Sequence, residues 1–311
     1  MVACRVLLLQ RVDDDELDSR LMQALVVVLA LLTLTSLGIL VSRTLEMNGG
    51  DWLSLGHDVH TVLSQTHYGE VWIWRVPALI LLWMVWLAAL RYRGDWWTGW
   101  IMFAALAIIA MTRSDTGHAA DAGDFVPLVW VDWLHLMAGG MWVGSLLGMA
   151  LVVFPRWLDR GAAVQARAAE VFQRLSSLSG AALAVVLGAG IFMAVQQLEH
   201  VSDLWRTRYG VALDVKIVVV AGMIFIGAWN RYIRLPGLLR QAGMPTRDAM
   251  LGRLFRRAVG TPVPLAPARA GELVRSCARA LLGESLLGLV VLAAAAVLLH
   301  APPPSDMVHM H

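Results

Sequence analysis

The chain has 311 residues, of which 58% are hydrophobic and only 15% charged, and its formal net charge is +2. A soluble domain is about a quarter charged, and the mean hydropathy here is +0.64, so the composition excludes an ordinary soluble globular protein. Cys4 and Cys277 are the two cysteines and are far apart in the chain, which argues against a disulfide framework or a thiolate metal site.

Apolar blocks long enough to cross a membrane recur along the chain. A hydrocarbon core about 30 Å thick needs about 20 apolar residues in a helix, which keeps its backbone hydrogen bonds internal. We therefore predict an all-α polytopic membrane protein, with a segment 1–20 followed by a helical membrane domain over 21–299. The seven predicted spans are 21–42, 71–90, 96–112, 126–154, 174–198, 211–234 and 273–299.

The arginines predict how these spans are oriented. The connections 91–95, 155–173 and 235–272 are rich in arginine, and the positive-inside rule places them in the cytoplasm. The N-terminal segment is then cytoplasmic, 235–272 is a cytoplasmic linker, and the tail 300–311 lies outside. The alternate connections carry only Arg43, Arg113, Arg206 and Arg208.

All nine histidines fall on the outer side of this topology or in the outer half of a span. His135 is nine residues into the fourth span, about 13 Å below its outer end if helical. Imidazole is a versatile metal ligand, so the pattern predicts a metal ion that reaches the protein from the outer side. The alternative is that histidines simply occur often in solvated loops and at helix ends. The other eight are His57, His60, His67, His118, His200, His300, His309 and His311.

The outer loop 43–70 is predicted to hold a short amphipathic helix. Its apolar residues recur at helical spacing, and on such a helix His57 and His60 share a face, with His67 seven residues later. A surface metal site and a simple solvated face fit this pattern equally. The apolar positions are Trp52, Leu55, Val59 and Val62.

The C-terminal tail combines imidazoles with thioethers after the rigid run 302–304 of three prolines. These ligand types together suit Cu(I) and Cu(II) rather than hard cations. We predict a weak metal-capture arm, with a fortuitous terminus as the alternative. Its candidate ligands are Met307, His309, Met310 and His311.

The chain also contains an internal repeat. Thr66 to Gly69 and Thr207 to Gly210 share the pattern Thr-x-Tyr-Gly, and each is followed six residues later by a cation, Arg75 or Lys216. His118 and His300 then close the corresponding outward spans. Spans one to three are therefore predicted to repeat spans five to seven in parallel, an arrangement in which transporters place sites at the repeat interface. The fourth span has no counterpart before the first.

Ionisable residues inside spans cost about 2.5–3.5 kcal/mol each near the centre, so they usually have a reason. The ordinary explanation for such a residue is a structural ion pair, for instance of Arg75 or Lys216 with Glu284 or Asp132. His135 differs because Asp132, one turn earlier, can accept its N–H, the usual support for a metal-bound histidine. A histidine and aspartate paired without metal is the alternative. A path inward would pass Met141, Trp142 and Met149.

Several of these motifs together resemble the CopD family of bacterial inner-membrane copper-resistance and copper-uptake proteins, over roughly 60–304. The resemblance implies a multi-pass protein that handles copper from the periplasm, often beside a CopC-type periplasmic copper-binding partner. Longer members carry eight spans, and from the resemblance we expect this chain to lack the histidine-bearing first one. The motifs are Val131-Asp132-Trp133-Leu134-His135 with Trp142-Val143-Gly144, Gly117-His118-Ala119, both Tyr-Gly-x5-Arg/Lys stretches, Asn230-Arg231, Arg279 with Glu284, and Pro302-Pro303.

Three functions fit this sequence. The first is copper import from the periplasmic side, with the copper oxidation state open. The second is a haem b redox protein, with axial ligands from His118, His135 or His300. The third is a non-transporting copper-binding or loading scaffold. Membrane lipid is the expected environment and a homo-oligomer is left open. No nucleophile triad, phosphate loop or basic nucleic-acid surface is present in the sequence, so we expect neither an enzyme nor a nucleic-acid partner.

Overall fold

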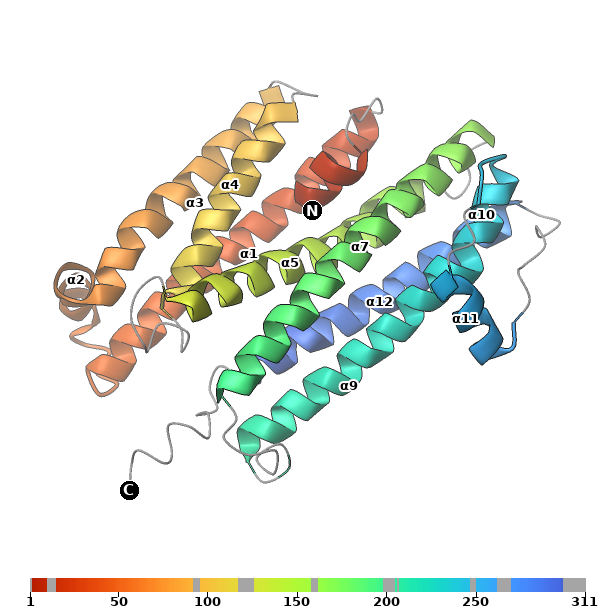
Figure 1. Cartoon of the computed structure of the whole chain (residues 1–311). Helices are drawn as coiled ribbons and strands as arrows, with labels where there is room; N and C mark the ends of the chain where they lie inside the picture. The colour runs from red at the N-terminus through yellow and green to blue at the C-terminus, as the bar shows by residue number, and fades with distance from the viewer. Residues whose placement is uncertain are drawn as a thin grey trace. The chain divides into compact units, whose positions relative to one another are not determined.

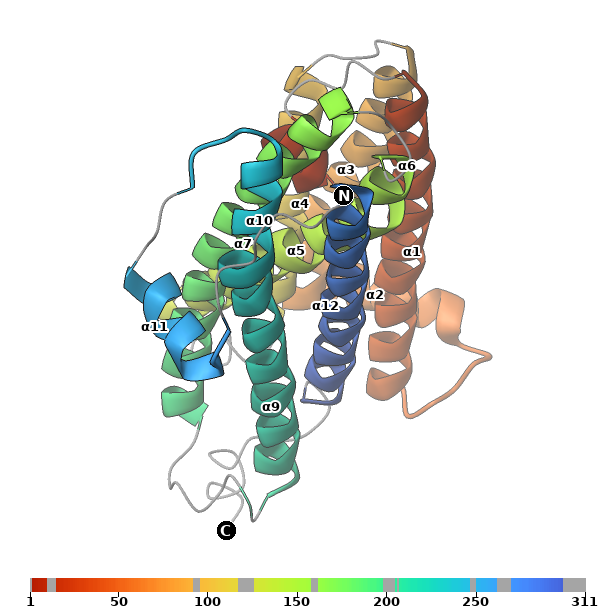
Figure 2. The same cartoon turned by 90° about the vertical axis from the view of Figure 1, so that its right-hand side faces the viewer.

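The computed structural model describes residues 2–9, 15–91, 96–116, 126–157, 162–197, 205, 207–246, 250–261 and 270–298. Every regular element among them is helical (Figures 1 and 2), which confirms the predicted all-α class. The chain forms two compact units, Met1–Met137 and Ala138–His311. The boundary between them falls within one helix, and each unit is described by itself.

Among the described residues, seven helices are long and apolar enough to cross a membrane, so the protein is a multi-pass membrane protein as predicted. Large apolar side chains point outward from them; Leu31, Ile73 and Val218 are 56%, 65% and 69% exposed. Such side chains are unfavourable in water and favourable against lipid tails. The spans are Glu16–Met47, His67–Arg91, Trp97–Ser114, Pro127–Trp157, Ala166–Gln196, Gly210–Gln241 and Val274–Ala295.

The first unit is built around three helices. Its core consists of residues that recur every three or four positions and so line one face of each helix, such as Leu82 and Val85 against Ala105 and Ile109. Helices α3 and α4 run side by side (Figure 1). The elements are η1 (Cys4–Leu9), α1 (Asp15–Met47), α2 (Leu55–Gln65), α3 (His67–Arg91), α4 (Trp96–Ser114) and the start of α5 (Pro127–Gly148).

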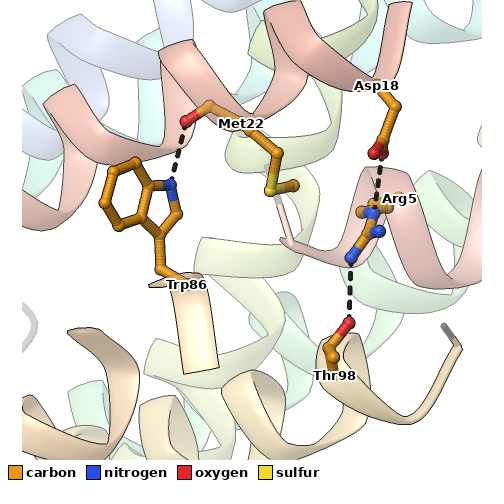
Figure 3. A network of polar contacts seen from close by, with 5 residues as sticks. All are labelled: Arg5, Asp18, Met22, Trp86 and Thr98. Atoms are coloured by element: carbon orange, nitrogen blue, oxygen red, sulfur yellow. Dashed lines mark hydrogen bonds and ion pairs between the residues drawn. The ribbon is translucent and has the colours of Figure 1, made fainter. Parts of the chain in front are cut away.

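The N-terminal segment is part of this unit rather than only a tail. In the short π-helix η1, Arg5 forms an ion pair of 3.1 Å with Asp18 of α1, and its Nη1 donates to the Thr98 hydroxyl of α4 at 3.1 Å (Figure 3). Close by, the Trp86 indole donates to the Met22 carbonyl (Figure 3). This network fastens η1 to α1 and α4.

Cys4 lies in η1 and is fully buried. Burial raises the pKa of the Cys4 thiol to about 11, because a low-dielectric environment disfavours the thiolate. The thiolate is the form that binds metal. At neutral pH the Cys4 side chain is therefore a neutral thiol.

The second unit pairs α9 with α12, which lie side by side (Figure 2). Aromatic contacts attach the shorter elements: Phe154 packs on Phe172 with ring centroids 5.9 Å apart, and Phe255 packs on Tyr232 at 5.7 Å. Besides the rest of α5, the elements are η3 (Met149–Val153), α6 (Phe154–Trp157), α7 (Ala162–Gln197), α9 (Arg208–Trp229), η4 (Asn230–Arg234), α10 (Leu235–Gln241), α11 (Met250–Val259) and α12 (Ala270–Leu298).

Several helices continue beyond the predicted spans. α1 begins at Asp15 and ends at Met47, and α7 begins at Ala162, ahead of the predicted start at 174. The predicted linker 235–272 contains two helices, α10 and α11. The physical reason is that hydropathy marks what lipid tolerates, whereas arginine, glutamate and glutamine are good helix formers and prolong a helix into the polar zone.

Both copies of the repeated Thr-x-Tyr-Gly motif begin a helix in the same way. The Thr66 hydroxyl accepts a hydrogen bond from the Gly69 amide at 3.3 Å, and the Thr207 hydroxyl accepts one from Gly210 at 2.9 Å. Both threonines have extended backbones, with ψ of 152° and 154°. A threonine in this position satisfies an amide that has no partner within the helix. The repeat therefore corresponds to a shared local structure at the start of α3 and of α9.

Candidate functional site

The predicted His135–Asp132 pair lies on α5. Both side chains are half-buried, and they are three residues apart, so they stand about one turn apart on neighbouring parts of one helix face. Between them, the Trp133 indole donates to the Ala107 carbonyl of α4 at 2.9 Å. That bond attaches α5 to α4 beside the pair and fixes the rotation of the helix there.

The three predicted path residues follow on the same helical segment. Met141 is half-buried, Trp142 is 5% exposed, and Met149 is fully buried. At Met149 the α-helix changes into the π-helix η3. Such π-bulges are rare and occur frequently at functional sites. A thioether buried at this position is a neutral, soft ligand without competing charge.

Of the histidines predicted to lie outside, only His57, His60 and His67 are among the described residues, and these three do not form a metal cluster. His57 and His60 are exposed on α2, and Val62 on the opposite face is buried, which confirms a short amphipathic helix within the loop 43–70. Trp52, predicted to belong to its apolar face, instead precedes α2 and is 68% exposed. The ring Nδ1 of His67 lies 3.6 Å from a carboxylate oxygen of Glu70. Within the described residues, no three His, Cys, Asp or Glu side chains form a group that could hold a metal ion.

Several candidate ligands lie outside the described residues, so their placement is untested. They are His118, His200, His300, Met307, His309, Met310 and His311.

A polar network orders the turn before α2. The Asn48 amide donates to a carboxylate oxygen of Asp58 at 2.7 Å, and the Ser54 hydroxyl donates to the same oxygen. These two hydrogen bonds, that from Ser54 foremost, lower the pKa of Asp58 below its ordinary value, because they stabilise the ionised carboxylate. The network holds the start of the helix that carries His57 and His60.

Arg75 of α3 is 2% exposed, although it is a cation inside a span. Its Nε donates to the Thr112 hydroxyl of α4 at 2.9 Å, and its guanidinium carbon lies 5.5 Å from the centroid of the Trp72 ring. No carboxylate among the described residues forms an ion pair with it. Sequence reasoning proposed a carboxylate partner for Arg75, and the structure instead supplies a hydroxyl and an aromatic face.

Glu284 of α12 belongs to a chain of polar contacts in the second unit. Its Oε2 accepts from the Asn230 amide at 3.2 Å, and the Asn230 Oδ1 accepts from Arg234 Nη1 at 2.6 Å. Arg234 Nε donates to the Ser276 hydroxyl at 3.2 Å. A Cβ on Gly227 would lie 2.8 Å from Glu284 Oε1, so the glycine makes room for the carboxyl group.

Asn230 thus separates a buried carboxyl group from a guanidinium, at the point where α9 becomes the π-helix η4. The sequence analysis named Asn230 only as part of a family motif and did not predict this role, although an asparagine inside the span 211–234 was a usable signal. Lys216, the repeat partner of Arg75, is half-buried on α9.

Comparison with known proteins assigns the two halves separately. Residues 1–127 match the profile described as copper resistance protein D-like, N-terminal domain, and residues 169–298 match copper resistance protein D. The chain belongs to the copper resistance protein D (CopD) family. The N-terminal profile ends where the fourth span begins, and the second starts after that span has ended, so His135 lies in neither matched region.

Two relatives carry copper in their names. Copper transport protein CutJ of Bacillus subtilis (strain 168) is 27% identical over 221 residues, which are 69% of this chain and 40% of that protein. Copper resistance protein D of Pseudomonas syringae pv. tomato is 26% identical over 216 residues, 67% of each chain. The match thus spans well under two thirds of CutJ. No solved structure matches this chain.

Proposed function

We propose that this protein carries copper across the bacterial inner membrane, taking the ion from the periplasmic side. The observation that supports this most directly is His135, a half-buried imidazole inside a span of a CopD-family chain, with Asp132 one turn away. An imidazole whose second nitrogen donates to a carboxylate is a well-oriented and more basic metal ligand. Membership of a copper family supports copper as the metal that this ligand would bind.

In this proposal copper passes from His135 inward along α5 toward Met149. The charge on Arg75 or Lys216 prevents those side chains from coordinating the ion, whereas the buried Met149 thioether suits Cu(I). His57 and His60, both exposed on α2, would present copper before it reaches His135. The orientation rests on the arginine distribution, which places α2 outside.

A periplasmic copper-binding protein of the CopC type is the proposed donor. The exposed imidazoles of α2 offer the kind of ligand to which copper transfers by exchange.

The test measures copper flux rather than copper resistance. Proteoliposomes containing the purified protein are incubated with ⁶⁴Cu in the external buffer, once under reducing and once under non-reducing conditions. Uptake is compared between the wild type, His135→Ala and the neighbouring control Leu134→Ala. Leu134 is 47% exposed on the same helix, so its truncation leaves the site intact. We expect His135→Ala to lose at least tenfold in initial rate and Leu134→Ala to keep it.

Equal rates for wild type and His135→Ala would refute the proposed path. Copper that binds in the expected stoichiometry but never enters the vesicles would instead identify a loading scaffold. A visible spectrum of the same sample checks the haem alternative, since a Soret band would contradict a copper carrier without haem. Both relatives are named for copper, and we therefore expect none.

A further inference from the structure

Arg75 is a buried cation whose charge nothing in the described residues balances. It is 2% exposed, and its Nη2 has no hydrogen-bond partner. Arg113 on α4 adds a second positive charge close by. Burying a charge is strongly unfavourable unless a counter-charge and hydrogen bonds compensate it. Within the described residues, the structure therefore contains a buried positive charge that a bound anion would balance.

Two more donors lie on the same face of α3. Tyr68 and Trp72 precede Arg75 by seven and three residues, which is the spacing of one helix face, and their ring centroids are 6.3 Å apart. The Tyr68 hydroxyl and the Trp72 indole nitrogen are both buried and have no hydrogen-bond partner among the described residues. An indole N–H and a guanidinium can only donate, so these side chains lack an acceptor.

The neighbouring groups do not supply that acceptor. The Thr112 hydroxyl accepts from Arg75 and uses its own proton on the Ile109 carbonyl at 2.8 Å. Asp115 directly follows the last residue of α4 and is 9% exposed, and it forms no ion pair with Arg75 among the described residues. A water molecule would satisfy hydrogen bonds but would leave the positive charge uncompensated.

We propose that Arg75, Trp72 and Tyr68 form a binding site for a small inorganic anion of the halide class, chloride under ordinary conditions. A monatomic anion accepts hydrogen bonds from any direction, which suits three donors spread over two turns of a helix. An anion here also lowers the electrostatic barrier that Arg75 presents to a copper cation in the outer half of the first unit. That second role rests on the proposed function, and the binding itself does not.

The binding test uses the purified full chain in detergent and gluconate buffer free of halide. Chloride is added, and its ³⁵Cl line width and binding isotherm are recorded. We expect saturable binding of one chloride per chain, lost in Arg75→Gln and kept in the control Arg43→Gln. Arg43 is an exposed arginine paired with Glu46 on α1, so the control changes total charge equally.

Two gentler variants remove one donor each. Trp72→Phe and Tyr68→Phe keep an aromatic ring and should each weaken chloride binding several-fold, even if Arg75→Gln does not fold. Binding unchanged in all three variants would mean an adventitious ion only and would overturn the proposal. Binding of acetate but not of chloride, dependent on Arg75, would also overturn it, in favour of a carboxylate ligand.

The functional arm compares ⁶⁴Cu uptake into proteoliposomes in chloride and in gluconate. We expect uptake to fall several-fold without chloride in wild type and to be independent of chloride in Arg75→Gln. Uptake that proceeds equally in both buffers overturns the charge-balancing role and leaves the copper carrier standing. Absent uptake with chloride still bound refutes the carrier and leaves the anion site standing.

Discussion

The contact between α2 and α3 depends on a glycine, and replacing it gives a sharp test of the structure. A Cβ on Gly69 would lie 2.1 Å from the carbonyl oxygen of Leu63, a distance that real Cβ atoms do not reach, and the obstacle is backbone that cannot rotate away. α2 must shift by about 1 Å, or the first turn of α3 must unwind and weaken the bond to Thr66. Overpacking of this kind costs about 1–3 kcal/mol.

Gly56→Ala is the matched control, because Gly56 lies within α2 and a Cβ there meets nothing within 4 Å. Alanine in a helix is favoured over glycine by about 0.8–1 kcal/mol, so the two glycine-to-alanine changes should have opposite signs. Hydrogen exchange of peptides covering 55–70 measures both, with faster exchange expected for Gly69→Ala and slower for Gly56→Ala. Wild-type protection in Gly69→Ala would show that α2 does not pack on α3 as described.

Three further changes probe other contacts. Thr207→Ala removes the cap of α9 and should cost about 1 kcal/mol in thermal unfolding, with Thr207→Ser close to wild type; no difference between the two would contradict the cap. Asp58 has a lowered pKa, so its stabilisation of the start of α2 is present above about pH 4 and is lost as the pH falls through the lowered value. Amide protection there should fall progressively as the pH is lowered below about 4, and Asp58→Asn should show no such fall. Asp18→Asn leaves Arg5 buried without a counter-charge and should cost about 3 kcal/mol, read out as a lower denaturation temperature, whereas an unchanged temperature would mean that the pair is solvated.

The spans were predictable because lipid imposes one simple requirement, about 20 apolar residues whose backbone bonds are internal. That requirement sets what crosses the membrane and does not set where a helix ends. α1 and α7 therefore extend beyond their predicted limits, and hydropathy did not predict the helices α10 and α11 at all. The docking of η1 was also hidden, because it rests on Arg5 meeting Asp18 and Thr98, of which Thr98 is 93 residues away in the chain.

The sequence showed where the intramembrane polar residues lie, but it did not predict which groups they contact. Arg75 and Glu284 stand out in any apolar span, yet the groups that they contact are 37 and 54 residues away in the chain. Electrostatic reasoning favours pairing opposite charges, and packing instead gave Arg75 a hydroxyl and Glu284 an amide. Only geometry could reveal this, since a threonine and an asparagine carry no charge that would mark them as partners.

The two repeats share a structural feature at the start of a helix but differ in the polar groups that they bury. Both begin with a threonine cap on a glycine amide, so the cap is a structural device that both copies retain. Their interiors have diverged. In the described part of the first unit the buried cation Arg75 has no counter-charge, whereas in the second unit the buried Glu284 accepts a hydrogen bond from Asn230. A pair of identical transport half-sites would need the same polar groups in both copies. The residue on which our proposed copper path depends, His135, lies on the fourth span, which belongs to neither repeat and to neither family match. Under our proposal, the repeats serve as scaffolds, and the metal ligand comes from the fourth span, which lies between them in the sequence.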